Sequence, residues 1–450
     1  MLAGLKSASQ LLYPGLGLKR WLIPLGLGLV FVGLGLGLIF SDIFLLTTKT
    51  PGFWPFATSW QRWLPGLLLM LVGTGCSSYS LFRLNTLFLA ALLPNQPTVR
   101  DVARQIYRHR RQRRDGPKVV VIGGGTGLSV LLRGLKHHTH NITAIITVAD
   151  DGGSSGKLRR ELGVLPPGDF RNCIAALADD EALITQLFQY RFRSGGLEGH
   201  SFGNLFITAM AGVTGSFVRA LYESGRVLSI GGTILPSTLE DVTLYAEVSE
   251  GSQTRKIEGE SAIPEAKLPI ERVYFQPDAP RAFPPAIQAI LNADLIVAGP
   301  GSLYTSVIPN LLVTEIVNAI RASDAPKIYI CNVATQPGET DDYTLADHVQ
   351  AIEAHTDLVN LHSEVVNGAD NFYKVQRTKK PLFDYVLANS NQDYPIPESM
   401  NHLKPIVPRY PETNGYKVIV ADVVDHQHPW RHDSPRLASQ LMKWYQTIKT

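Results

Sequence analysis

The chain has 450 residues, enough for one large domain or two ordinary ones. Its net charge of +3 is too small to indicate nucleic acid as a partner. Cys76, Cys173 and Cys331 lie far apart, and the sequence holds no Cys-x-x-C or Cys/His cluster. These observations support neither a disulfide framework nor a zinc site, and they fit a reducing compartment.

Two long apolar stretches open the chain. Trp21–Phe40 is twenty residues without a charge, enough to cross a hydrocarbon core of roughly 30 Å, and Trp63–Phe82 is a second such stretch. A cleaved signal peptide or a buried core helix is the alternative, but the first stretch is long for a signal peptide and a second soon follows. We therefore predict a membrane hairpin over residues 1–94. Gly33 and Gly37, four residues apart, suggest a face for close helix packing.

The placement of basic residues predicts the orientation of this hairpin. Lys6, Lys19 and Arg20 precede the first span, whereas the loop between the spans holds only Lys49 and Arg62. A basic linker, residues 95–116, follows the second span and contains Arg100, Arg104, Arg108, Arg110, Arg111, Arg113 and Arg114. Positive charge stays on the cytoplasmic side, so we expect a protein of the cytoplasmic membrane with its C-terminal domain in the cytoplasm. The linker either binds anionic headgroups or only fixes this topology.

From residue 117 to 450, apolar strands alternate with amphipathic helices. Strands are predicted at Lys118–Ile122, Ala144–Val148, Val227–Leu235, Thr243–Val248, Arg272–Gln276, Asp294–Ala298, Lys327–Asn332 and Lys417–Val424. Helices are predicted at Leu128–Lys136, Asp169–Ala178, Glu181–Tyr190, Phe202–Val213, Phe217–Ser224, Pro284–Asn292, Leu303–Ala322 and Tyr343–His355. This alternation predicts an α/β, Rossmann-like fold with a mostly parallel sheet covered by helices. Pro236–Pro280 is more charged and indicates an insertion or an antiparallel extension, and Ala388–Pro411 indicates a loop.

A glycine turn follows the first of these strands. Gly124, Gly125, Thr126 and Gly127 lead directly into a helix, an arrangement in which backbone N–H groups can approach a phosphate. Leu128 stands where a dinucleotide fingerprint has its third glycine, which disfavours NAD. The later GGSSGK segment is one residue short of a P-loop, and Leu158 replaces the magnesium-binding hydroxyl.

A second phosphate-type loop follows a later strand. It reads Gly299-Pro300-Gly301-Ser302 and precedes another predicted helix. Since the carboxyl ends of parallel strands share one edge of a sheet, we expect the two loops to face each other across a crevice. Hydroxyl donors for the same ligand would come from Thr126, Ser129, Ser154, Ser155 and Ser302.

Paired acids end the second strand. Asp150 and Asp151 can bind ribose hydroxyls, ligate a magnesium ion between phosphates, or merely cap the following turn, and one carboxylate suffices for a hydrated magnesium ion. Asp169 is predicted to cap a helix, with Arg171 or Asn172 in its first turn pointing at an anion.

The segment HSFGN, residues 200–204, opens a further helix. Asn204 can read a base edge or a ribose, whereas His200 by itself is more often structural. No Ser/His/Asp triad follows from the spacing.

Five segments carry a resemblance to a known family. They are GGGTGLSVLLRGLK, TVADDGGSSGKLRRELGVLPPGDFRNCIAALA, HSFGNLF, VAGPGSLYTSVIPNLLV and CNVATQPGET. In this order and spread, they resemble the YvcK family, the gluconeogenesis factors, which are related to 2-phospho-L-lactate transferase (CofD). The match is closer to the YvcK branch than to the transferase branch. The N-terminal hairpin is a departure, since typical members lack it.

This resemblance implies a cytoplasmic Rossmann-like domain that binds a nucleotide sugar of the UDP-N-acetylglucosamine type. It implies a role in carbon partitioning, cell-wall precursor supply and cell shape, with no secure catalysed reaction. The alternative is a magnesium-dependent transferase, because the CofD relatives move a phospholactyl-type group from a guanosine diphosphate carrier onto a deazaflavin. An unidentified protein partner and a homo-oligomer stay open, and no nucleic acid is expected.

Matching positions of the family give a set of ligand-binding residues. They are Gly124, Gly125, Thr126, Gly127, Asp150, Asp151, Asn172, Asn204, Gly299, Gly301, Ser302, Tyr304, Tyr410 and Arg431. Asp150 is the candidate magnesium ligand.

Overall fold

The computed structural model describes residues 19–48, 59–92, 116–179, 181–366, 381–400, 402–408 and 415–449. The chain divides into two compact units, residues 1–110 and 111–450. The basic run Arg100–Arg114 and the predicted ligand residue Tyr410 lie outside the described residues.

The N-terminal unit contains two long helices, α2 (Lys19–Thr48) and α3 (Ser59–Leu92). Within the described residues, both are long and apolar enough to cross a membrane, over Trp21–Phe40 and Trp63–Asn85. Only 11% of each apolar window is buried inside the protein. Most of this surface therefore needs an apolar surrounding, as a bilayer provides.

Glycines bring α2 and α3 close together. A Cβ atom on Gly35 would lie 2.6 Å from the carbonyl oxygen of Gly66, so the two backbones touch where neither residue has a side chain. Gly33 and Gly37 have no atom within 4 Å of such a Cβ. The packing face predicted from those two glycines is therefore wrong, because they point away from the partner helix.

The C-terminal unit is built on a seven-stranded sheet of order β10-β9-β8-β7-β1-β2-β3, in which every pair of neighbours is parallel. Its strands are β1 (Val119–Gly123), β2 (Ile142–Ile146), β3 (Thr233–Pro236), β7 (Leu295–Ala298), β8 (Lys327–Ile330), β9 (Tyr385–Asn389) and β10 (Lys417–Ala421). The central strands β1, β7 and β8 are buried along their whole length, as expected when helices cover both faces. The predicted fold class is confirmed.

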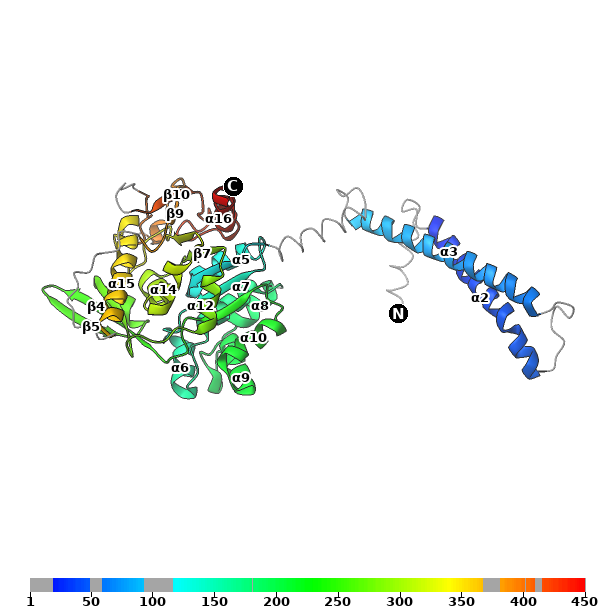
Figure 1. Cartoon of the computed structure of the whole chain (residues 1–450), viewed down its shortest axis with the longest axis horizontal. Coiled ribbons are helices and arrows are strands. Elements are labelled where there is room, and N and C mark those ends of the chain that lie inside the picture. Colours follow the sequence, from blue (N-terminus) through cyan, green and yellow to red (C-terminus); the bar gives the residue numbers. More distant parts are fainter. Residues whose placement is uncertain are drawn as a thin grey trace. The chain divides into compact units, whose positions relative to one another are not determined.

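Helices connect the strands of this sheet (Figure 1). They are α5 (Gly125–Leu135), α6 (Gly153–Leu162), α7 (Gly168–Leu177), α8 (Glu181–Gln189), α9 (Phe202–Thr214), α10 (Phe217–Val227), α12 (Pro284–Leu291), α13 (Ile308–Leu311), α14 (Thr314–Ala322), α15 (Leu345–Val366) and α16 (Ser434–Lys449). Short turns are η1 (Gly195–Leu197), the π-helical turn η2 (Leu303–Val307) and η3 (Glu398–Met400). Helix α5 packs against α7 and α16, while α12 packs against α14.

The direction of winding reverses between β1 and β7. From β1 the sheet grows through β2 to β3, and from β7 it grows the opposite way through β8 and β9 to β10. Right-handed crossovers in opposite directions place their helices on opposite faces of the sheet. In doubly wound proteins, the carboxyl edge of the sheet at such a switch point holds the ligand-binding crevice.

The predicted insertion is a separate three-stranded antiparallel sheet, order β5-β4-β6. It comprises β4 (Thr243–Glu250), β5 (Gln253–Glu258) and β6 (Ile270–Gln276), with the short helix α11 (Ala262–Glu265) between the last two. In Figure 1, β4 and β5 extend away from the main sheet at the side of α15.

Several predicted elements differ from the structure. The strand predicted at Val227–Leu235 begins only at Thr233, because α10 continues to Val227 and Gly232, at φ +153°, turns the chain in between. The helix predicted at Leu303–Ala322 is broken into η2, α13 and α14, with a 73° bend. The sequence reading also missed β5, β9, α6 and α16; the start of the predicted loop Ala388–Pro411 belongs to β9.

Candidate functional site

The loops after β1 and β7 meet directly at the crevice. A Cβ atom on Gly127 would lie 2.7 Å from Cα of Gly301, and the N–H of Gly299 donates a 2.9 Å hydrogen bond to the carbonyl of Ile122. The two predicted phosphate loops are thus brought together, but side by side in contact rather than across a gap. Their glycines leave backbone exposed where a ligand can approach it.

A third loop, after β8, braces the loop after β7. Asn332 donates from Nδ2 to the carbonyl of Gly301 at 2.8 Å and accepts the N–H of the same residue at 3.3 Å. Gln336 donates from Nε2 to Oγ of Ser302 at 2.6 Å. The predicted ligand residues Gly301 and Ser302 are therefore held in place by side chains from a neighbouring strand end.

The buried residue Glu339 holds the residues that follow this loop. Its carboxyl group accepts the backbone N–H of Tyr304 at 3.1 Å and the hydroxyl of Thr305 at 3.0 Å, and burial raises its pKa to about 7. The Tyr304 hydroxyl pairs with that of Tyr343 at 2.7 Å, and its side chain is 2% exposed. Tyr304 thus packs behind the loop, and burial raises the pKa of its phenol.

Two carboxyl groups lie near the first glycine loop. Asp169 approaches the loop itself, since a Cβ atom on Gly124 would lie 2.5 Å from its Oδ2, while Asp150 lies beside the start of α7, where a Cβ atom on Gly168 would lie 2.5 Å from its Oδ2. Burial, then the nearby Asp150 charge, raises the pKa of Asp169 to about 7, against a lowering hydrogen bond from the N–H of Gly125. Burial is also the largest cause that raises the pKa of Asp150.

The local roles of these acids differ from the prediction in one case. Asp150 accepts the N–H of Gly152 at 3.0 Å, so the turn-capping role is realised. Asp169 does not cap its helix, because α7 begins at Gly168 with Pro167 before it and no side-chain cap. Its carboxyl group instead turns toward the N-terminus of α5.

Asp151 is tied to the inserted sheet. Its Oδ1 accepts the N–H of Ser261 at 3.0 Å and the Ser261 hydroxyl at 2.7 Å, and Gly259 packs on the other oxygen. These contacts place the neighbouring Glu260 beside the crevice. Burial, then the charges of Asp150 and other acids of the site, raises the pKa of Glu260 to about 8.

A second polar group forms where α6 and α9 begin. Oγ of Ser154 lies 3.1 Å from Nδ1 of His200, and Asn204 donates from Nδ2 to Oγ of Ser155 at 3.3 Å. Asn204 is 2% exposed, and its Oδ1 is buried without a hydrogen-bond partner among the described residues. An unpaired buried acceptor costs roughly 1–3 kcal/mol, which a ligand donor would recover.

Arg171 connects α7 to this group. It donates from Nη1 to Oγ of Ser201 at 2.8 Å and from Nη2 to Oδ1 of Asn172 at 3.0 Å, and its buried Nε has no partner in the part of the chain that the structure describes. Burial, followed by the charge of Arg191, lowers its pKa. The side-chain oxygen of Asn172 therefore accepts its hydrogen bond from Arg171. The guanidinium group of Arg171 lies near the carboxyl groups of the crevice.

Arg431 is not brought to the glycine loops. It is exposed in the turn between β10 and α16, where its backbone N–H donates to the carbonyl of His428 at 2.9 Å. Among the described residues, no hydrogen bond or ion pair joins its side chain to either glycine loop.

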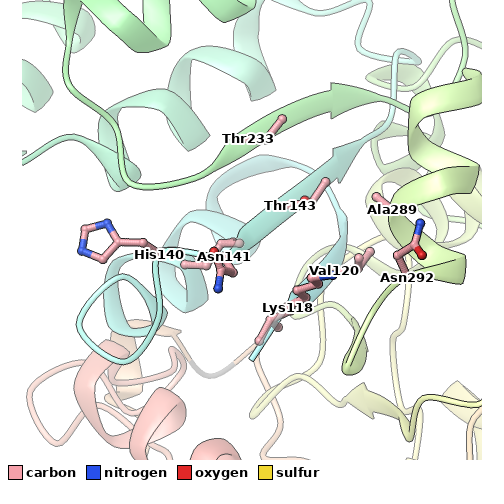
Figure 2. Close-up of a pocket in the computed structure, with 10 residues that line it drawn as sticks. Lys118, Val120, His140, Asn141, Thr143, Thr233, Ala289 and Asn292 are labelled. Carbon is pink, nitrogen blue, oxygen red and sulfur yellow. The ribbon is translucent and has the colours of Figure 1, made fainter. Parts of the chain in front are cut away.

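The pocket drawn in Figure 2 lies at the opposite edge of the sheet. It has a volume of about 260 Å³ and is lined at the amino ends of β1, β2 and β3, by residues that include Lys118, Thr143 and Thr233. None of the predicted site residues lines it. We assign the functional site to the carboxyl edge, because the glycine loops, the acids and the unpaired Asn204 acceptor are there.

The described residues hold no group of three or more His, Cys, Asp or Glu side chains that could bind a metal ion. A magnesium ion at Asp150 would accordingly need phosphate oxygens and water to complete its shell, which is how this ion is usually held.

The parallel sheet, its switch point and the touching glycine loops define a doubly wound α/β protein. The family model described as 2-phospho-L-lactate transferase CofD matches residues 119–443. The chain belongs to this CofD family, as the motifs indicated.

Relatives place the chain near proteins named gluconeogenesis factor. It is 45% identical to the gluconeogenesis factor of Bacillus subtilis, over 72% of this chain and 97% of that protein. A Nostoc protein described provisionally as a gluconeogenesis factor is 46% identical over 96% of this chain and 92% of its own length. The Nostoc alignment therefore includes most of the N-terminal unit, whereas the Bacillus protein matches little beyond the C-terminal one.

A solved structure shares the fold. The crystal structure of a UPF0052 family member from Bacillus halodurans superposes with a TM-score of 0.62 at 41% identity, covering 73% of this chain and 99% of that one.

Sequence reasoning missed part of the site. Asn332, Gln336 and Glu339 were quoted only as a family motif, although their position just after a strand of the parallel sheet is a usable signal. No local signal marks Glu260, because only the packing of the inserted sheet brings it to the crevice.

Proposed function

We propose that the C-terminal unit binds a nucleotide sugar of the UDP-N-acetylglucosamine type in the crevice between β1 and β7. The observation that carries this proposal is the contact of the two glycine loops, where Gly127 meets Gly301. Their adjacent backbones suit a diphosphate, whose two charged groups can each approach one loop and the N-terminus of α5.

The buried Oδ1 of Asn204 supports the nucleotide part of this proposal. No side chain or backbone group of the described residues donates a hydrogen bond to it. An amide N–H of a base or of an N-acetyl group would satisfy it, while a sugar without such a donor would leave it unpaired.

The protein acts as a regulator in this proposal, through ligand-dependent control of carbon partitioning, cell-wall precursor supply and cell shape. The names of the Bacillus and Nostoc relatives support a regulatory role. Helices α2 and α3 anchor it in the cytoplasmic membrane, with the C-terminal unit in the cytoplasm and available to a protein partner.

A second candidate is a magnesium-dependent transferase of phosphorus-containing groups. The matching family model supports it, and so do the acids at the crevice, Asp150, Asp169 and Glu260. These carboxyl groups repel a diphosphate unless a cation or protons neutralise them. Asp150 would hold a magnesium ion that supplies this neutralisation.

Calorimetry on the full chain in detergent tests the first candidate. We expect saturable binding of UDP-N-acetylglucosamine, at least tenfold weaker binding for Asn204→Ala, and unchanged binding for the exposed amide variant Asn292→Ala at the other edge of the sheet. Absence of binding to any UDP-sugar would refute the proposal. Formation of a transfer product from a guanosine diphosphate-linked phospho-acid and a deazaflavin, with magnesium, would favour the second candidate.

A further inference from the structure

The segment from the end of α6 to the end of α10 exposes many of the large apolar side chains of the C-terminal unit. Of the fourteen large apolar side chains exposed in the described part of residues 116–449, eight lie between Leu162 and Val227. They are Leu162, Leu183, Leu187, Tyr190, Leu197, Val213, Tyr222 and Val227. Figure 1 shows α8, α9 and α10 gathered in one region of the unit.

One of these residues, Val213, lies at the bend between α9 and α10, which we call the apolar corner (residues 209–218). The two helices meet at 117° and together are apolar enough to resemble a broken or re-entrant membrane segment. No charged residue occurs from Phe202 to Val218. Val213, near the bend, is 84% exposed, although an aliphatic side chain in water is unfavourable by roughly 1–2 kcal/mol.

One exposed basic residue lies at the corner, and others lie at the far ends of the two helices. Arg219 is exposed in the first turn of α10, and Arg226 is exposed at its end, paired with Glu223 at 2.9 Å. Arg191 and Arg193 are exposed in the segment before α9. An uncharged apolar tip with Arg219 beside it matches the interface of an anionic bilayer, where the tip enters the acyl boundary and the cation meets headgroups.

We propose that the apolar corner docks the C-terminal unit onto the anionic lipid surface of the membrane that holds α2 and α3. The proposal requires α2 and α3 to lie in a bilayer and does not depend on the bound nucleotide. Only 23 residues separate Leu92 from Gly116, so the attachment reaches no farther than roughly 80 Å. This tether keeps a lipid surface at high effective concentration, so even a weak docking contact becomes populated.

A second copy of the chain fits the corner less well. In a two-fold interface centred on the bend, Arg219 of one copy would lie close to Arg219 of the other, and the two like charges would repel. Docking on lipid also leaves the crevice free, because Val213 lies about 14 Å along α9 from Asn204.

The test uses the full chain in vesicles, with an environment-sensitive fluorophore attached through Val213→Cys. Cys173 and Cys331 are 0% exposed and will not react, and Cys76→Ser removes the third thiol. The matched control carries the fluorophore through Leu291→Cys on α12, where the native side chain is 49% exposed. Vesicles contain phosphatidylcholine alone or mixed with phosphatidylglycerol.

We expect the Val213→Cys fluorophore to shift to the blue and to be quenched by spin-labelled lipid in the anionic vesicles, and the Leu291→Cys fluorophore to do neither. Adding Arg219→Glu should reduce the lipid quenching at least twofold. A Val213→Cys fluorophore that stays accessible to aqueous iodide in anionic vesicles would overturn the proposal. A blue shift that follows protein density rather than lipid composition would also overturn it, in favour of contact between copies.

Discussion

Gly127 and Gly301 hold the loops after β1 and β7 in backbone contact, since a Cβ atom on Gly127 would lie 2.7 Å from Cα of Gly301. The atoms that this Cβ would meet belong to the backbone and cannot rotate away. Gly127→Ala should therefore push the loops apart, lower the free energy of unfolding by about 1–3 kcal/mol and weaken nucleotide-sugar binding. Thermal unfolding and calorimetry measure the two effects.

Gly196→Ala is the control for this variant, because a Cβ atom there has nothing within 4 Å and the residue has no positive φ. It should change neither stability nor binding. A fully stable Gly127→Ala variant with native affinity would show that the loops tolerate separation.

We expect Asn332 to affect nucleotide-sugar binding through the loop that it holds. Asn332→Ala removes both hydrogen bonds to the backbone of Gly301 and leaves that loop free to move. We expect a loss of about 1–3 kcal/mol in stability and a clear loss of nucleotide-sugar affinity. Asn332→Asp keeps the acceptor and loses the donor, so its affinity should fall differently from that of the alanine variant; equal affinities for all three proteins would contradict the bracing role.

Stability should depend on pH through Asp169, whose pKa is raised from 3.8 to about 7. Between these two values the folded state binds more protons than the unfolded state, so the free energy of unfolding falls as pH rises from about 4 to about 7. The slope from one such carboxyl group is at most about 1.4 kcal/mol per pH unit. Denaturant titrations at several pH values should show a shallower decline for Asp169→Asn than for the unaltered protein, and parallel declines would argue against this pKa.

The two membrane helices offer a matched pair of glycine variants. Gly35→Leu places a side chain against the carbonyl of Gly66, whereas Gly33→Leu points into open space. In detergent, the first should separate α2 from α3 and raise the protease sensitivity of the hairpin, while the second should behave like the unaltered protein. Equal sensitivity of the two variants would contradict the observed packing face.

Removal of residues 1–94 tests the anchor. The truncated protein should leave the membrane fraction and keep its nucleotide-sugar binding, because no described element of the parallel sheet comes from that segment. Membrane fractionation measures the release of the truncated protein, and calorimetry measures its nucleotide-sugar binding. A truncated protein that folds but no longer binds the sugar would mean that the segment does more than tether.

The sequence by itself determined the α/β class, the two membrane-type helices and the glycine loops after β1 and β7. These features depend on local periodicity, on length and on the backbone freedom of glycine, all of which can be read from neighbouring residues. Irregular elements were not predicted. Helix α6 begins inside a glycine-serine run that is typical of a loop, and the π-helical turn η2 interrupts an apolar stretch that suits a continuous helix.

Only the tertiary structure decided which residues surround the crevice. Asn332 comes from the loop after β8 and Glu260 from the inserted sheet, and each reaches the site through contacts between segments far apart in the chain. The same holds for Asp169, which caps no helix but faces the N-terminus of α5 and acquires its raised pKa from burial. Burial and long-range packing depend on the whole fold. A local sequence pattern can therefore indicate which residue types a site contains, but not which residues come together in it.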